Sequence, residues 1–258
     1  MRTRRIKQIL RRNPFPHRRT LGFFYGEKMR AIASILPQEE HRSVLEVGGG
    51  ASGLTSLFFP RARVVNVDPD PPARERQRQA ATRTQLVPGV ATRLPFASSV
   101  FDCVTLFDVL EHVPDDQMAA AEAMRVLRPG GSVLVSCPSR EWRYPYYRSG
   151  FPNICSSEVG IMAEWGHVRR GYSREDIPRL FSGCESVAAS SYINPLTVIA
   201  HDIAFSKLDE RLKIALILLQ YPVTLFGYVV GWPGPRMGLA FTLRKAGQRS
   251  PHKVEVAA

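Results

Sequence analysis

The chain has 258 residues and a globular composition, in which 44% of the residues are hydrophobic and 22% are charged. This length can bury one sizeable core, so we expect one domain with additions. The net charge of +12 favours an anionic partner such as nucleic acid, an anionic membrane surface or an acidic substrate. The four cysteines form no C-x-x-C pair and no Cys/His ligand spacing, so we expect reduced thiols in a cytoplasmic protein.

Basic side chains dominate residues 1–19, at Arg2, Arg4, Arg5, Lys7, Arg11, Arg12, Arg18 and Arg19. The segment lacks the continuous apolar core of a signal peptide, although it superficially resembles a transit peptide. A basic arm that touches a membrane or polyanion and a solvated disordered tail both remain open. Residues 20–36 have apolar side chains at roughly helical spacing, which predicts a helix that packs on a sheet edge or caps a bound cofactor.

An apolar run over residues 43–47 leads directly into Gly48, Gly49 and Gly50, and a stretch of helical character begins at Leu54. This pattern predicts a buried parallel strand, a tight turn and a helix. Glycines let a ligand approach main-chain N–H groups without a Cβ in the way, and the start of a helix adds partial positive charge. The turn is therefore predicted to hold a polar ligand.

Two acidic residues indicate which ligand the turn holds. Asp68 ends the next predicted strand about 20 residues beyond the glycines, the spacing at which a Rossmann-type sheet places an acid on a ribose diol. Glu46 lies two residues before the first glycine, where it would repel a pyrophosphate but suits a cationic amine. S-adenosylmethionine (SAM) has an ammonium group, a sulfonium and no phosphate, so these residues favour SAM over a dinucleotide such as NAD.

Strands alternate with helices along most of the chain. Cys103 and Cys137 fall inside predicted buried strands, where cysteine behaves as a small hydrophobic residue. A turn signal at 128–131 ends one of the helices. The predicted strands lie at 43–47, 62–68, 85–87, 101–107, 132–136, 186–192 and 239–243. The predicted helices lie at 20–36, 53–60, 73–82, 114–128 and 174–182.

Residues 139–171 are long for a plain connection, so we interpret them as a lid over the carboxyl ends of the strands, where ligands bind in such sheets. An aromatic-lined pocket for a ring-containing substrate and an aromatic mini-core that holds the loop together explain its composition equally well. The aromatic residues are Trp142, Tyr144, Tyr146, Tyr147, Phe151 and Trp165.

Residues 214–235, between the last two predicted strands, contain no charged side chain. The stretch is long enough to span a membrane, but both of its ends must return to one sheet. This favours a helix–turn–helix on one leaflet, with a bend at Pro222 or Gly227. Packing within the protein and a dimer interface are the alternatives. The flanking basic residues, which suit an anionic membrane surface, are Lys207, Arg211, Lys213 and Arg236.

Five motifs in register carry a family resemblance. They are Glu46-Val47-Gly48-Gly49-Gly50, Asp68, Leu94-Pro95-Phe96 with Phe101-Asp102, Asp108-Val109-Leu110-Glu111-His112-Val113-Pro114, and Val126-Leu127-Arg128-Pro129-Gly130-Gly131. Over roughly residues 40–190 the chain resembles the class I SAM-dependent methyltransferases, most closely the small-molecule group that includes the ubiquinone and menaquinone methyltransferases. The resemblance implies an α/β, Rossmann-like seven-stranded sheet with helices on both faces, strand seven antiparallel, and a helical hydrophobic insertion between strands six and seven.

The resemblance also implies which residues bind SAM. Members of this group commonly have an Asp at the position of Val90, where it meets the adenine amino group. Valine cannot accept that hydrogen bond, so we expect the adenine to depend on main-chain groups near Ala91 or on water. The expected cofactor-binding residues are Glu46, Gly48, Gly49, Gly50, Asp68, Pro69, Ala91 and Asp108.

Methyl transfer needs an aligned nucleophile, exclusion of water and, for a hydroxyl acceptor, a group that removes a proton. The candidate catalytic residues are His112, after the fourth strand, and His167, on the lid, because histidine titrates near neutrality. A hydrogen bond at a helix start for His112 and a loop-ordering contact for His167 are the structural alternatives. We see no catechol-type carboxylate cluster and expect no metal.

We therefore expect a SAM-dependent methyltransferase that acts on a small, lipid-linked or membrane-associated acceptor, such as a quinone-like ring, a lipid or a glycan precursor. An RNA methyltransferase and a non-catalytic SAM-binding membrane protein are the alternatives. Nucleic acid is disfavoured because residues 108–111 lack the Asn/Asp-Pro-Pro-Tyr/Phe stretch of base N-methylation sites. We expect a cytoplasmic protein with a peripheral membrane contact. Its expected parts are a basic arm at 1–19, a methyltransferase domain at 20–246 with the lid at 139–171 and the insertion at 193–236, and a disordered tail at 247–258.

Overall fold

The computed structural model describes residues 21–70, 84–141, 158–229 and 236–247. The predicted basic arm, the helix predicted at 73–82, half of the predicted lid and nearly all of the predicted tail lie outside these residues.

Seven strands form one sheet in the order β3-β2-β1-β4-β5-β7-β6. Strands β1 to β5 pair in parallel, and β7 runs antiparallel to both of its neighbours. This arrangement confirms the predicted Rossmann-like sheet with strand seven antiparallel. The strands are β1 Ser43–Val47, β2 Arg63–Asp68, β3 Thr84–Pro88, β4 Phe101–Phe107, β5 Leu127–Pro138, β6 Cys184–Tyr192 and β7 Gly238–Lys245.

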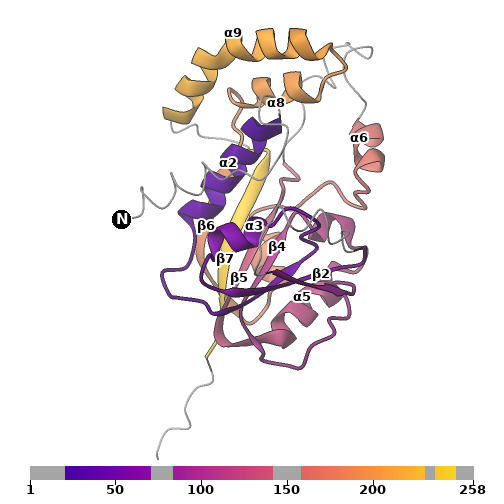
Figure 1. Ribbon diagram of the computed structural model, residues 1–258, viewed down its shortest axis with the longest axis vertical. Helices are drawn as coiled ribbons and strands as arrows, with labels where there is room; N and C mark the ends of the chain where they lie inside the picture. Colours follow the sequence, from indigo (N-terminus) through magenta and orange to yellow (C-terminus); the bar gives the residue numbers. More distant parts are fainter. Residues whose placement is uncertain (1–20, 71–83, 142–157, 230–235, 248–258) are drawn as a thin grey trace, which may run out of the picture.

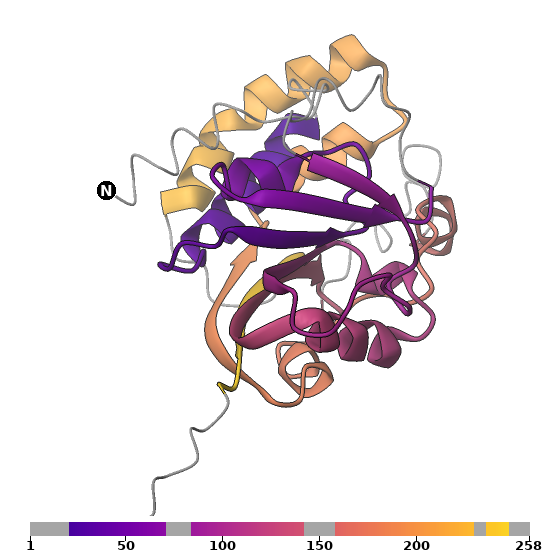
Figure 2. The same cartoon turned by 60° about the horizontal axis from the view of Figure 1, so that its bottom comes forward.

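Helices cover both faces of the sheet, as predicted (Figure 2). Successive side chains of a strand point to opposite faces, so Leu45 packs in the core under α5 and α7, while Val44 packs in the core under α2 and α3. Cys103 and Cys137 are buried in β4 and β5, as their sequence context predicts. The helices are α2 Leu21–Ser34, α3 Leu54–Phe58, the 3-10 turn η1 Leu110–His112, α5 Asp116–Val126, α6 Glu158–Glu164, α7 Asp176–Leu180, α8 Val198–Phe205 and α9 Glu210–Val229.

The fifth strand begins earlier than the sequence predicts. Leu127 directly follows α5 and already pairs with Phe101 of β4, before a shift of register. Gly130 takes a φ of 78°, and a Cβ on Gly131 would lie 2.6 Å from the Leu127 side chain. The glycines expected to make a free turn therefore form an irregular start to β5.

The insertion between β6 and β7 forms α8, which packs against α2, and α9, which packs against α8 at one end of the molecule (Figure 1). The bend predicted at Pro222 or Gly227 is wrong, because the turn lies at 206–209 and α9 continues through Pro222. Asp209 starts α9 by accepting a hydrogen bond from Arg211 N at 2.9 Å. Pro222 removes the usual donor to the Leu218 carbonyl, but Leu218 is exposed, so water can satisfy that carbonyl. Among the described residues, no helix combines the length and apolar character needed to cross a membrane.

Candidate functional site

Side chains of β2 hold the glycine turn after β1. Asn66 Oδ1 accepts a hydrogen bond from Gly49 N at 3.1 Å, and Asn66 Nδ2 donates to Gly50 O at 2.9 Å. Asp68 Oδ2 accepts from Gly50 N at 3.0 Å, and Gly48 N donates to Val67 O at 2.7 Å. The turn is therefore fixed before any ligand arrives.

The glycines are required by the space around them. A Cβ on Gly49 would lie 2.4 Å from the Glu46 carboxyl carbon, and a Cβ on Gly48 would lie 2.8 Å from a methyl group of Val109. Gly48 and Gly50 also have φ values of 66° and 51°, in the left-handed region that favours glycine. The Val109 contact brings the segment after β4 directly against the turn.

Glu46 is a buried acid with an unused oxygen. It is 2% exposed, and its Oε1 accepts a long hydrogen bond of 3.4 Å from Thr55 N. Its Oε2 has no hydrogen-bond partner among the described residues. Burial raises the pKa of Glu46 to about 6. A buried acid of this kind suits a cationic group, and the role of Glu46 as the partner of the SAM ammonium stays a prediction.

The other predicted cofactor residues of β2 and β3 also lie at the carboxyl ends of the strands, beside the point where the strand order reverses. Asp68 is half-buried, and Pro69 is exposed beside it. Asp68 uses its two oxygens for Gly50 N and Asp70 N, which leaves further lone pairs for a diol. Ala91 is half-buried against the core, whereas Val90 is exposed.

Asp108 occupies the end of β4 with a φ of 53°. Its carboxylate forms an ion pair with Lys28 of α2 and accepts a hydrogen bond from Ser136 Oγ at 2.9 Å. Helix α2 therefore reaches the site through a buried lysine. The role of Asp108 as a SAM contact stays a prediction, and these two partners are additional to it.

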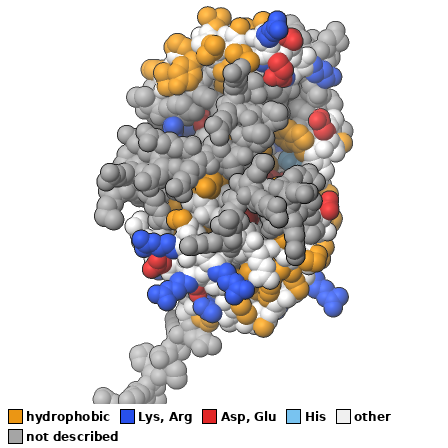
Figure 3. All heavy atoms as spheres, viewed as in Figure 1, with side chains coloured by type: hydrophobic (Ala, Val, Ile, Leu, Met, Phe, Trp, Pro, Cys, Tyr) orange, Lys and Arg blue, Asp and Glu red, His pale blue; other side chains and the backbone are white. Residues whose placement is uncertain are grey.

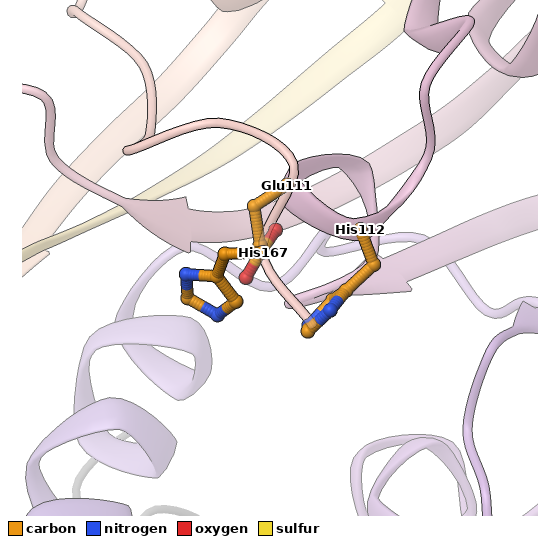
Figure 4. Close-up of side chains that lie close together, drawn as sticks. All are labelled: Glu111, His112 and His167. Atoms are coloured by element: carbon orange, nitrogen blue, oxygen red, sulfur yellow. The ribbon is translucent and has the colours of Figure 1, made fainter. Parts of the chain in front are cut away.

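Glu111, His112 and His167 come together beyond β4 (Figure 4), with one potential ligand atom of each within 4.8 Å of the others. The imidazole rings of His112 and His167 meet edge to face, with their centroids 4.7 Å apart. Val168 N donates to Glu111 O at 2.9 Å, which fastens the loop that carries His167 to the 3-10 turn. The structure thus places both predicted catalytic histidines in one cluster.

Burial shifts the protonation of this cluster. It raises the pKa of Glu111 well above the ordinary value, and the nearby Asp108 charge raises it further. It also lowers the pKa of His167, and His112 adds to that shift. At neutral pH the His167 ring is therefore neutral, with a lone pair available for a proton or a metal ion.

Sequence reasoning assigned no role to three residues at this site. Asn66 is a polar residue in the middle of a buried strand, which is a usable signal for a structural hydrogen bond. Glu111 lies within the Asp108–Pro114 motif, but its burial cannot be read from the motif. Lys28 gave no signal, because its partner Asp108 is 80 positions away.

Comparisons with known proteins cover the part of the chain that contains the glycine turn. Residues 45–135 match the family model described as a methyltransferase domain. Over these residues the chain is similar to methyltransferase domains. The matched segment begins in β1 and ends in β5, so it includes the glycine turn, Asp68 and the Glu111–His112 pair.

Relatives match a part of the chain. An uncharacterised methyltransferase from Mycobacterium sp. (strain KMS) is 38% identical over 96 residues, which are 37% of this chain and 38% of that protein. The ubiquinone/menaquinone biosynthesis C-methyltransferase UbiE of Nitrosospira multiformis is 34% identical over 108 residues, with 39% and 44% of the two chains covered. The matches thus span less than half the length of these relatives.

Solved structures share the fold over most of the chain. A SAM-dependent methyltransferase from Mesorhizobium loti has a TM-score of 0.57 at 15% identity, covering 86% of this chain and all of that one. The N-methyltransferase NodS from Bradyrhizobium japonicum, in complex with S-adenosyl-L-homocysteine, has a TM-score of 0.55 at 14% identity, covering 94% and 97%. These likenesses show the class I methyltransferase fold.

Proposed function

We propose that this protein is an enzyme that transfers a methyl group from SAM to a small acceptor. The observation that carries the proposal is the turn at Gly48, Gly49 and Gly50. Asn66 holds this turn by two hydrogen bonds. The turn packs against the buried Glu46, whose Oε2 has no hydrogen-bond partner among the described residues. A carboxylate in that position opposes a pyrophosphate and suits an amine. The family match over residues 45–135 supports the same cofactor.

In this proposal each cofactor residue has one task. Glu46 takes the ammonium of SAM, Asp68 takes the ribose hydroxyls, and main-chain groups near Ala91 border the adenine. SAM supplies an electrophilic methyl group on a sulfonium that is a good leaving group. His112 and His167 are the candidate general bases, which would remove a proton from the molecule that receives the methyl group.

Calorimetric titration of the purified chain with SAM tests this proposal. We expect binding in the wild type and at least tenfold weaker binding in Asp68→Asn, which is about 1.4 kcal/mol. Asp70→Asn is the matched control, because Asp70 is an exposed acid two residues further along, and it should bind like the wild type. A folded wild type that does not bind SAM would overturn the proposal.

For the acceptor we propose a lipid-linked or membrane-associated molecule, brought to the enzyme by a peripheral membrane contact of α9. Large apolar side chains of α9 are exposed, with Leu219 at 78% and Phe226 at 59%. In Figure 3 hydrophobic side chains cover the end of the molecule where α9 lies in Figure 1. A clustered apolar surface of this kind marks an interaction site, and the exposed Lys207 and Arg211 beside it suit an anionic lipid surface.

A further inference from the structure

Glu111 is a buried acid whose carboxylate lacks hydrogen-bond partners among the described residues. Its side chain is fully buried, and neither carboxylate oxygen has a hydrogen-bond partner among the described residues. Buried polar groups in native proteins are nearly always paired, and a buried carboxylate without a partner is costly. The unpaired oxygens point to a positively charged ligand.

The neighbouring histidines are arranged as ligands for the same group. In Figure 4 the side chains of Glu111, His112 and His167 converge from two segments that are far apart in the sequence. His112 Nδ1 lies 3.2 Å from Gly166 O. A hydrogen bond to a backbone carbonyl through one ring nitrogen leaves Nε2 free, which is the usual arrangement of a metal-binding histidine.

We propose that Glu111, His112 and His167 bind a divalent transition-metal ion such as Zn²⁺. Two imidazole nitrogens and one carboxylate oxygen are a ligand set for zinc and its neighbours, whereas Mg²⁺ and Ca²⁺ prefer oxygen ligands throughout. Catalytic zinc sites also have three protein ligands and keep a position open. This proposal departs from our expectation of a site without metal, which rested on the absence of a carboxylate cluster and of Cys/His ligand spacing in the sequence.

The cluster is close to the dimensions that an ion requires. Ligand atoms about 2.0–2.1 Å from a tetrahedral ion are about 3.3 Å apart, and the three potential ligand atoms here lie within 4.8 Å of one another. The hydrogen bond from Val168 N to Glu111 O already holds the two backbone segments together. Rotation of the side chains is therefore enough to bring the three ligand atoms to the shorter distances. The nearby Lys28 charge is paired with Asp108.

The ion would lie beside the cofactor turn, because Val109, two residues before Glu111, contacts Gly48. The catalytic role of the ion rests on the proposed function. In that role the open position holds a hydroxyl or carbonyl oxygen of the acceptor, and a hydroxyl bound there loses its proton more readily. The acceptor would therefore carry oxygen at or next to the methylated atom, and the two histidines would hold the ion instead of accepting the proton.

Direct titration of the chelator-treated full chain with ZnCl₂ tests the site without any methyl acceptor. We expect one equivalent of Zn²⁺ to bind the wild type and at least tenfold weaker binding in both His167→Asn and Glu111→Gln. His41→Asn is the control, because His41 lies outside the cluster, where its Nδ1 is 3.0 Å from Glu39 O and its ring meets Phe59 edge to face. Circular dichroism of each variant verifies that it is folded.

A second measurement does not depend on any variant. Co²⁺ bound to the wild type should show visible bands of nitrogen and oxygen ligands without the intense charge-transfer band of a cysteine thiolate. Absence of stoichiometric binding to the folded wild type, equal binding by folded cluster variants, or a thiolate spectrum would each overturn the metal site. SAM titration of the metal-free wild type separates this outcome from failure of the proposed function, since the turn at Gly48–Gly50 needs no metal.

Discussion

Glu27 shows what a single buried acid does in this fold. Its Oε2 accepts hydrogen bonds from Ile193 N at 3.1 Å and Thr197 Oγ1 at 3.2 Å, so it connects α2 to the start of the insertion. Burial raises the pKa of Glu27 to about 7, against the partial opposition of these hydrogen bonds and of the Arg30 and Arg236 charges. The folded protein therefore keeps a proton on Glu27 that the unfolded chain loses near its ordinary pKa of 4.5.

This difference makes stability depend on pH. Between about pH 4.5 and 7 the folded state binds the proton more strongly, so the contribution of Glu27 to stability is complete below 4.5 and is lost as the pH rises to 7. Glu27→Gln keeps the acceptor oxygen and removes the titration. We expect the free energy of unfolding of the variant, relative to that of the wild type, to be higher at pH 8 than at pH 4.5 by up to about 3 kcal/mol. Urea unfolding at the two pH values measures this difference. An equal difference at both pH values would contradict this account.

A glycine allows helix α9 to pack closely against the segment after β6. A Cβ on Gly227 would lie 2.9 Å from Leu196 Cβ and 3.1 Å from Thr197 Cγ2. Asn194 Nδ2 donates to Gly227 O at 2.7 Å, which ties the helix to the segment after β6. The buried side of α9 includes the polar Thr224 beside the apolar Ile217, while large apolar residues such as Leu219 are exposed, which explains why hydropathy alone does not place this helix.

Substitution of this glycine should loosen α9. We expect Gly227→Val to lower the free energy of unfolding by about 1–3 kcal/mol, as overpacking of a close contact does. Ala215→Val is the control, because Ala215 is exposed on the same helix and the substitution adds a valine without the close contact. Helix propensity alone would make Ala215→Val the more destabilising of the two, since valine is a poorer helix former than alanine but a better one than glycine. Thermal unfolding followed by circular dichroism compares the two, and equal melting temperatures would argue against close packing at Gly227.

The whole molecule combines a net charge of +12 with one concentrated apolar surface. Leu212, Leu219 and Phe226 repeat every seven residues and are all exposed, so they lie along one side of α9. The opposite side packs on α8. This distribution is typical of a helix that lies in a membrane interface, with basic residues near the headgroups.

Co-sedimentation with vesicles that contain an anionic phospholipid tests this surface. We expect the wild type to bind them, more weakly at high salt because part of the attraction is electrostatic, and the double variant Leu219→Glu/Phe226→Glu to bind at least tenfold less. Met118→Glu/Val187→Glu is the control, since both residues are exposed and apolar away from α9. If the wild type does not bind vesicles but sediments as a dimer, and the α9 double variant sediments as a monomer, the surface is a contact between two copies.

Features that depend on neighbouring residues could be predicted from the sequence. The strand at 43–47, the glycines that follow it and Asp68 are determined by local hydrophobic pattern and backbone freedom, so the cofactor turn followed from them, whereas the seven-stranded fold was implied by the family resemblance. Histidines His112 and His167 could be nominated by their chemistry. Each of these depends on what a residue is and on a spacing of about 20 positions or fewer.

Only the tertiary structure decided which distant groups meet. Glu111 and His167 become neighbours because loop 165–170 returns to the end of β4, and Lys28 reaches Asp108 because α2 lies across the sheet. Pro222 is tolerated within α9 at a position where Leu218, whose carbonyl it leaves without its usual donor, is exposed, and that exposure depends on packing elsewhere. Burial and long-range contact are properties of the folded chain, so no local pattern contains them, and the proposed metal site rests on both.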